Sequence, residues 1–473
     1  MKFSLSNKHN IVRSRIFYGI GAIAFGVKGN GLNFLLLYFY SQILGLPADM
    51  VSFGLFIAIL VDSISDPLIG LLSDRFRSKL GRRHPFMYLF GLPAGIAYYY
   101  LWSPPSLETE QLFVYFLTVT ILARTLMTFY EVPSVALGPE LTLDYDERTK
   151  FAATRYFFGW WGGLTMALLV YFVFLPEAEG GMSNLDGWQN YGMVAATVIV
   201  LSTYICGFGL HSQIPFLTQP QDKSNSFREL VSQVRQSLAN KQFIALFASA
   251  SFFAMGAGVF LSLSIYFGRH FWGLSTEQLG YLQLPLFLSA LIALLVAPIV
   301  SNNLGKKKAA LITVVLWLLI APLPIVLRLT GAFPSNDSDI LLPILMLFAF
   351  IETSLAIMIG VYLSAMFADI VEDSQVETKA RSEGLYYSAS SFTQKALNSV
   401  GVLIAGQLLT YVEFPTSAVQ QDVSEATITK LAIITIAVLS VVYLAAITSL
   451  MFYKIDKSTH NKNLNEINRE QKK

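Results

Sequence analysis

The chain has 473 residues, of which 54% are hydrophobic and only 14% are charged. A soluble domain averages about 25% charged residues. Runs of about 20 mainly apolar residues recur along this sequence, so we predict an all-α protein that spans a lipid bilayer. The net charge of +2 excludes a basic surface for nucleic acid, and the single cysteine, Cys206, excludes a disulfide within the chain. No phosphate-binding loop of the G-x-x-x-x-G-K-S/T type occurs, so nothing indicates ATP hydrolysis, and we expect no enzymatic activity.

Twelve stretches are long and apolar enough to form membrane-spanning helices, when each is counted against the requirement of about 20 residues. An even number of spans places both ends of the chain on the same side of the membrane. We predict helices at about residues 16–43, 49–73, 84–104, 110–140, 150–176, 188–212, 242–268, 275–302, 307–329, 339–368, 384–412 and 427–453.

The charges of the predicted loops alternate along the chain. The N-terminal segment, every second loop and the C-terminal tail carry Lys and Arg, whereas the loops at 44–48, 103–110, 177–187 and 413–426 contain neither. Loops rich in Lys and Arg lie on the cytoplasmic side of a membrane. We therefore predict a multi-pass protein of a bacterial inner (plasma) membrane with both termini in the cytoplasm.

A long polar segment at 213–241 divides the sequence into two halves with six predicted helices each. A short basic turn with glycine follows the second helix of each half (SDRFRSKLGRRHP and SNNLGKKKAAL), which indicates a weak internal repeat. We predict an N-terminal six-helix bundle at 1–212, a cytoplasmic linker at 213–241, a C-terminal six-helix bundle at 242–453 and a disordered cytoplasmic tail at 454–473. Two six-helix halves are the arrangement of a major facilitator transporter.

Two carboxylates, Asp62 and Asp66, stand one helical turn apart in the apolar stretch SFGLFIAILVDSISDPLIGLL. Residues four apart share one helix face, and each charge within a membrane costs about 2.5–3.5 kcal/mol on insertion-derived scales. Two like charges on one buried face are unfavourable unless a cation or a proton neutralises them. The pair predicts a site for a coupling ion, and the alternative is a structural network of ion pairs between helices.

Three stretches resemble the glycoside–pentoside–hexuronide:cation symporters. They are DSISDPLIGLLSDRFRSKLGRRHPF at 62–86, YEVPSVALGPELTLDYDERTKFAATRYFF at 130–158 and MFADIVEDSQVETKARSEGLYYSASSFTQKAL at 366–397. They occur in the order and spacing expected for that family. The resemblance implies a two-bundle, twelve-helix major facilitator fold and uptake of a sugar driven by Na⁺, H⁺ or Li⁺.

The resemblance also implies a cation site built from oxygen ligands on the second and fourth helices. Its candidate ligands are Asp62, Asp66, Glu131, Thr128 and Ser65, with Na⁺ held at Asp62 and Asp66. Three carboxylates are too many for one Na⁺, so we expect one of them to be protonated or offset by Lys28 or Lys395. No other cofactor is expected, and the choice between Na⁺ and H⁺ stays open.

This sequence departs from the family pattern at positions that bind the sugar. The family's helix-one Lys–Asp pair, whose Asp binds galactosides, aligns with Phe25 and Gly26, and the helix-four Trp that stacks on the sugar aligns with Val135. The candidate substrate residues are Lys28, Asn30, Asn33, Glu131, Arg155, Lys395 and Ser391. We expect a cargo other than a neutral galactoside, either an acidic sugar or a glycoside of different stereochemistry. In the alternative, Lys28 pairs with Glu131 or Asp62 and never meets the substrate.

The sequence contains further charged residues beside the candidate ligands. Asp74, Arg75, Arg82 and Arg83 are predicted to form a conformational latch at the cytoplasmic face, and Asp369 to be a gate or loop anchor. Arg124 precedes Glu131 by seven residues and so lies on a similar helix face. It is either a structural ion-pair partner or a substrate contact.

These observations predict a symporter that moves a sugar together with a monovalent cation by alternating access. We expect it to act as a monomer. One alternative is a symporter of the same fold for a lysolipid or another amphiphile, because a less polar pocket at Phe25 and Val135 would suit such a cargo. A more remote alternative is a membrane sensor that binds sugar and signals without transport.

Overall fold

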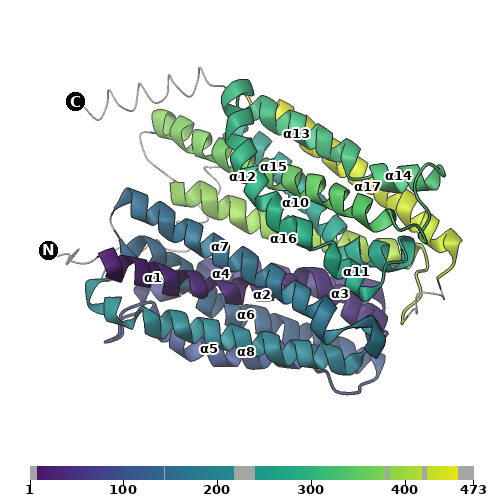
Figure 1. Cartoon of the computed structure of the whole chain (residues 1–473). Helices are drawn as coiled ribbons and strands as arrows, with labels where there is room; N and C mark the ends of the chain where they lie inside the picture. The colour runs from purple at the N-terminus through teal and green to yellow at the C-terminus, as the bar shows by residue number, and fades with distance from the viewer. Residues whose placement is uncertain (1–7, 143, 218–239, 379–382, 418–422, 456–473) are drawn as a thin grey trace. The chain divides into compact units, whose positions relative to one another are not determined.

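The computed structural model describes residues 8–142, 144–217, 240–378, 383–417 and 423–455, and within these ranges the chain forms helices and no strand (Figure 1). Ten helical stretches are long and apolar enough to cross a membrane, which confirms an all-α membrane protein. Two further helices, α5 (His84–Trp102) and α16 (Glu383–Tyr411), have 19 and 29 residues but do not reach that apolar content. Three consecutive tyrosines make α5 less apolar, and polar residues fill the first half of α16. The count of twelve spans stays a prediction for these two.

The chain divides into two compact units. The first, unit 1, contains residues 1–227, 275–280 and 415–419. The first span is a broken helix in which π-helical turns follow Asn30 and Tyr38. The α-helices of unit 1, besides α5, are α1 (Lys8–Ile20), α2 (Ala22–Asn30), α3 (Leu36–Tyr38), α4 (Ala48–Arg75), α6 (Thr109–Leu141), α7 (Tyr145–Leu169) and α8 (Leu185–Gly209).

The second, unit 2, contains the remaining residues, 228–274, 281–414 and 420–473. The observed helix ends lie within about five residues of the predicted ones with two exceptions: α1 begins eight residues before position 16, and α15 extends ten residues beyond position 368. Besides α16, the helices of unit 2 are α10 (Lys241–Tyr266), α12 (Leu284–Leu304), α13 (Lys306–Ile320), α14 (Leu323–Leu329), α15 (Leu341–Thr378) and α17 (Glu425–Met451). The short α11 (Thr276–Tyr281) belongs to unit 1 except for its last residue.

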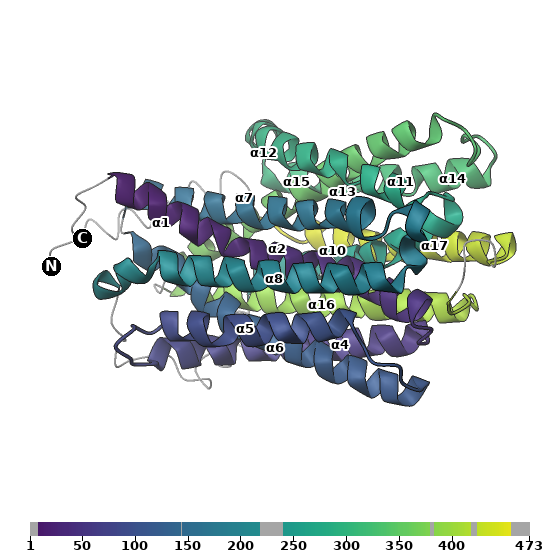
Figure 2. The same cartoon turned by 60° about the horizontal axis from the view of Figure 1, so that its bottom comes forward.

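The two units use the same scheme of helix packing (Figures 1 and 2). In unit 1, α2 packs on α7 and α8, α4 packs on α6, and α5 packs on α6 and α8. In unit 2, α10 packs on α16 and α17, α12 packs on α15, and α13 packs on α15 and α17. Each contact in the first set has a counterpart in the second when the spans are numbered from the start of each half. Such internal repeats are common in secondary transporters.

Glycine permits the closest helix contact in each unit. A Cβ atom on Gly26 of α2 would lie 1.9 Å from the carbonyl oxygen of Gly159 on α7. A Cβ atom on Gly401 of α16 would lie 2.1 Å from the carbonyl oxygen of Met255 on α10. Helices in lipid gain little from hydrophobic burial, because lipid is as apolar as a side chain, so close packing at small residues supplies much of their attraction.

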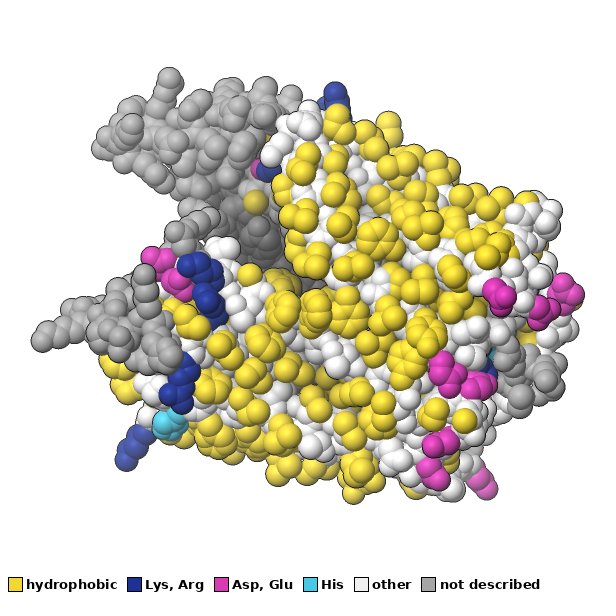
Figure 3. Space-filling model, in the orientation of Figure 1, with side chains coloured by type: hydrophobic (Ala, Val, Ile, Leu, Met, Phe, Trp, Pro, Cys, Tyr) yellow, Lys and Arg dark blue, Asp and Glu magenta, His cyan; other side chains and the backbone are white. Residues whose placement is uncertain are grey.

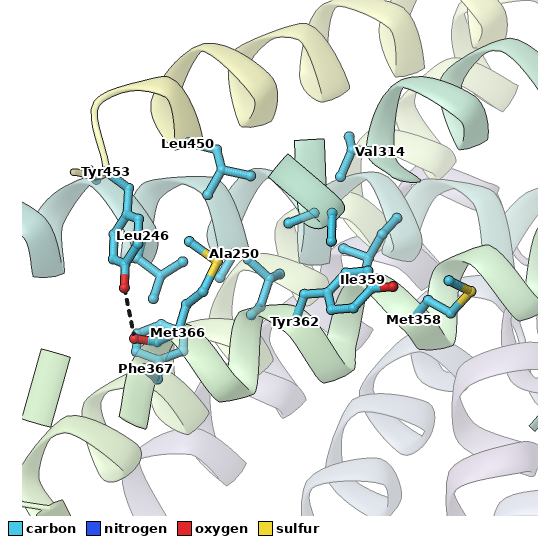
Figure 4. Packing of buried hydrophobic residues seen from close by; sticks show 14 of the residues in the cluster. Leu246, Ala250, Val314, Met358, Ile359, Tyr362, Met366, Phe367, Leu450 and Tyr453 are labelled. Atoms are coloured by element: carbon cyan, nitrogen blue, oxygen red, sulfur yellow. Dashed lines mark hydrogen bonds between the residues drawn. The ribbon is translucent and has the colours of Figure 1, made fainter. Parts of the chain in front are cut away.

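The core of unit 2 is built from aromatic and aliphatic side chains of α10, α12, α13, α15 and α17, part of which Figure 4 shows. Tyr362, Met366 and Phe367 of α15 belong to this core. The hydroxyl of Tyr453 donates a hydrogen bond to the carbonyl oxygen of Met366 at 3.4 Å. This bond fixes the chain just after α17 against α15.

The surface drawn in Figure 3 is covered mainly by hydrophobic side chains between the two ends of the helices. On the part of this face that the structure describes, most Lys and Arg side chains lie toward one end, and most, but not all, Asp and Glu side chains lie toward the other. An apolar belt between charged ends is what a bilayer requires of the surface that faces it.

A substitution at Gly26 tests the close contact between α2 and α7. We expect Gly26→Val to lower the unfolding temperature of the purified protein in detergent, because overpacking typically costs about 1–3 kcal/mol and the atom that blocks the new side chain is backbone. Gly360→Ala on α15 is the matched control, because no atom lies within 4 Å of a Cβ there. Equal unfolding temperatures for the two variants would show that α2 and α7 do not pack this closely.

Candidate functional site

The second span places Asp62 in the interior of unit 1. Its side chain is 2% exposed, and the hydroxyl of Thr128 donates a 2.6 Å hydrogen bond to its Oδ1. Pro67 follows Asp66 within α4 and has no N–H to donate to the carbonyl of Ser63, four residues earlier. The helix therefore carries an available backbone oxygen beside its two carboxylates.

One face of α6 supplies the partners of this carboxylate. Arg124, Thr128 and Glu131 follow one another at spacings of four and three residues, so their side chains share that face. The Arg124 Nη1 atom lies 3.7 Å from the Oδ2 atom of Asp62. Both oxygens of Asp62 are thus engaged by α6, one by a hydroxyl and one by a guanidinium.

Helix α2 contributes Lys28, whose Nζ atom lies 2.7 Å from the Oε2 atom of Glu131. Both side chains are largely buried, and neither could lie there unpaired without a large desolvation cost. The close packing of α2 on α7 holds Lys28 in place. This is the ion pair that the sequence left as the alternative to a substrate contact.

The five charged side chains form one group, which we call the charged cluster: Lys28, Asp62, Asp66, Arg124 and Glu131. Asp66 lies one turn beyond Asp62 and is half-buried. All three carboxylates lie close enough to Arg124 to interact electrostatically with it. The structure therefore brings together the acids predicted for the cation site and adds two bases to them.

The cation site predicted at Asp62, Asp66 and Glu131 stays a prediction. Within the part of the chain that the structure describes, no group of three or more His, Cys, Asp or Glu side chains converges closely enough to hold a metal ion. Glu131 instead pairs with Lys28. The hydroxyl of Ser65 donates to the carbonyl of Asp62 at 3.0 Å, which leaves its oxygen lone pairs free to face a cation.

The predicted substrate residues are more scattered. The Asn30 amide donates to the carbonyl of Gly163 at 2.7 Å and so ties the first span to α7, while Asn33 is exposed. The Arg155 guanidinium donates to the Ser134 hydroxyl at 3.1 Å and lies over the ring of Tyr18.

Two further predicted substrate residues lie on α16. Lys395 is half-buried within unit 2, and the side chain of Ser391 lies outside the described residues.

The structure shows why position 26 holds a glycine. Because Gly26 touches the α7 backbone, no side chain fits at this position, and an aspartate could not stand there without moving the helix. The structure exposes both other residues that were compared with the family pattern, Phe25 and Val135, and both are apolar.

Three of the four residues predicted to form a latch, Asp74, Arg82 and Arg83, share an ion-pair network within unit 1, and we keep the name latch for this network. It includes a residue that the sequence analysis missed. Arg83 donates to Asp74 at 2.5 Å and to Glu140 at 3.2 Å, and Arg82 donates to Glu140 at 2.7 Å. Arg75 is exposed and makes none of these bonds. Glu140, at the end of α6, is the more buried of the two acids and is the centre of the latch.

Unit 2 contains a related pair. The Nζ atom of Lys306, at the start of α13, lies 2.5 Å from the Oδ1 atom of Asp369, near the end of the spanning part of α15. In both units a base at the start of the third span thus meets an acid on the fourth. A position-by-position comparison of the two halves of the sequence could have identified Glu140 as the partner of Arg83 and Lys306 as the partner of Asp369.

Comparisons with known proteins agree with this architecture. The chain matches the family model described as MFS/sugar transport protein over residues 17–457. It is 24% identical to the putative glycoside/cation symporter YagG of Escherichia coli over 94% of this chain and 92% of that protein. A shorter match, over 32% of this chain and 29% of the other, is 30% identical to the sodium-dependent lysophosphatidylcholine symporter 1 of Xenopus tropicalis.

Among solved structures, the nucleoside transporter NupG superposes with a TM-score of 0.61. The match covers 93% of this chain and 99% of that one, at 15% sequence identity. At this identity the likeness shows a shared fold and carries no information about the cargo.

The latch geometry yields a comparison between its two acids. We expect Glu140→Gln to lower the unfolding temperature more than Asp74→Asn does. Glu140 is largely buried and accepts from two arginines, and removing one partner of a buried ion pair typically costs about 3–5 kcal/mol. Asp74 is 43% exposed, so water compensates for its loss. Thermal unfolding of the purified variants measures the difference, and a larger effect at Asp74 would contradict this assignment.

Proposed function

Because the chain belongs to the glycoside–pentoside–hexuronide:cation symporter family, we propose that it carries a sugar or glycoside into the cell together with a monovalent cation. The observation that supports this most strongly is the charged cluster, in which three carboxylates and two bases stand inside a membrane-spanning bundle. Charged residues at that depth persist where they serve an ion or substrate pathway. Alternating access then moves both solutes without covalent chemistry.

We propose that the coupling ion, Na⁺ or H⁺, binds beside Asp66. The oxygen atoms of Ser65 and the carbonyl of Ser63 that Pro67 leaves available are the further ligands that α4 offers. Hard cations prefer such carboxylate, hydroxyl and carbonyl oxygens. Glu131 would join this set when Lys28 releases it, and Lys395 would link the ion to the substrate, as in the family pattern.

The proposed cargo is a neutral glycoside rather than an acidic sugar. The sequence favoured an acidic cargo because Lys28 could attract an anion, but this lysine lies 2.7 Å from Glu131. Its charge is already compensated. A second cargo class, a lysolipid or similar amphiphile, has some support from the exposed Phe25 and Val135 and from the short match to a lysophosphatidylcholine symporter.

The setting of this transporter is also proposed. Lys- and Arg-rich loops on one side indicate that both termini lie in the cytoplasm of a bacterial-type inner membrane. We propose that a monomer transports its cargo. Counterflow of labelled glycosides, and separately of lysolipid, in proteoliposomes tests the cargo class and also distinguishes a transporter from a sensor that only binds.

Neutralising the helix-two acids tests the cation site. We expect Asp66→Asn and Asp62→Asn each to abolish cation-dependent accumulation of substrate in proteoliposomes, because each removes one negative charge from the cluster. Glu179→Gln, an exposed acid in the loop between α7 and α8, is the control and should accumulate substrate normally. Normal accumulation by both aspartate variants would place the coupling site elsewhere.

Substituting Lys28 separates the two roles considered for it. Lys28→Gln leaves Glu131 without its 2.7 Å partner, so we expect a changed dependence of uptake on cation concentration and little change in substrate affinity. Uptake measured against substrate and against cation, in separate titrations, reports the two quantities. Loss of affinity for an acidic sugar with an unchanged cation dependence would instead make Lys28 a substrate contact.

A further inference from the structure

Arg124 is the feature of the charged cluster that neither the family pattern nor the proposed function uses. It stands midway along α6, and only 5% of its surface is exposed. Its Nε and Nη2 atoms are buried and have no hydrogen-bond partner among the described residues, and its Nη1 atom lies 3.7 Å from Asp62. A guanidinium keeps its charge under all physiological conditions, so a fixed positive charge lies next to the proposed ion site.

The position of this charge bears on which carboxylates remain for a cation. Thr128 donates to one oxygen of Asp62, and Arg124 faces the other. A cation that used Asp62 as a ligand would have to displace a guanidinium or share an oxygen with it, at the cost of repulsion between two positive charges. Both carboxylate oxygens of Asp62 therefore already have a partner on α6.

The charges of the cluster can be counted within unit 1. Asp62, Asp66 and Glu131 contribute −3, and Lys28 and Arg124 contribute +2, so the formal sum is −1. One monovalent cation brings this group to neutrality. Without Arg124 the sum would be −2, and the same membrane-embedded site would attract cations more strongly.

We propose that the guanidinium of Arg124 is a fixed positive charge that pairs with Asp62, so that Asp62 is not a ligand of the coupling ion. The same charge sets how strongly the site binds that ion. This inference rests on the proposed function, since it assigns the ion to Asp66 and its neighbours. In this proposal Arg124 affects ion binding through its charge, and other side chains bind the substrate.

Four variants separate charge from ligation. Arg124→Gln changes the formal sum to −2, Arg124→Lys keeps it at −1, and Asp62→Asn changes it to 0. The double variant Asp62→Asn with Arg124→Gln restores −1 while it lacks both side chains. The measured quantity is the shift in unfolding temperature of the purified full-length protein as Na⁺ is added, and as pH is lowered at fixed Na⁺, so that either coupling ion gives a signal.

We expect Arg124→Gln to respond to cations at concentrations lower by at least about tenfold. A unit charge within about 12 Å has an effect of this size at an effective dielectric constant of about 20. Arg124→Lys should respond as the wild type does, Asp62→Asn should lose the response, and the double variant should regain it. This recovery is the decisive result, because a cation ligand cannot be restored by removing a second residue.

Two results would overturn the inference. A double variant as unresponsive as Asp62→Asn would show that Asp62 is itself an ion ligand, and an unchanged cation response in Arg124→Gln would show that its charge has no effect. The variant Asp66→Asn distinguishes a failure of this inference about Arg124 from a failure of the proposed function. If it retains the wild-type cation response, the ion site lies elsewhere and both proposals fail, whereas if it loses the response, only the assignment of Arg124 is at stake.

Discussion

The compensation of buried charge governs the arrangement of unit 1. A carboxylate or an ammonium inside a membrane-spanning bundle is stable only with a partner of opposite charge, and the structure provides Lys28 for Glu131 and Arg124 for Asp62. These pairs connect α2 to α6 and α6 to α4. The two ion pairs therefore hold α2, α4 and α6 against one another at the charged cluster. Moving any one of these helices changes the electrostatic balance of the cluster.

Close helix contacts make these pairs reachable. Lys28 lies two residues from Gly26, where α2 meets the backbone of α7, and Asn30 donates to the carbonyl of Gly163 just beyond. Without this contact the lysine would not be held at 2.7 Å from its partner. A helix that packs by its glycine at position 26 must carry its polar group on another face, as this helix does with Lys28.

The repeated packing scheme extends to ion pairs at the ends of the spans. In each unit a base at the start of the third span pairs with an acid on the fourth, as Arg83 does with Glu140 and Lys306 with Asp369. The partners differ in residue type, so the repeat is preserved in geometry more than in sequence. Equivalent pairs in both units would give a transporter of this type two similar constraints, one within each unit.

The sequence by itself determined the membrane class, the positions of the spanning helices and the group of acids on the second and fourth helices. These follow from local features: apolar length, loop charge and spacing along one helix. Only the tertiary structure decided which base meets which acid, because Lys28 and Glu131 lie 103 positions apart and their pairing depends on how α2 packs. It likewise showed that Glu140 belongs to the latch and that Arg124 faces Asp62. Pairing between helices is a property of packing, and periodicity along one helix does not report it.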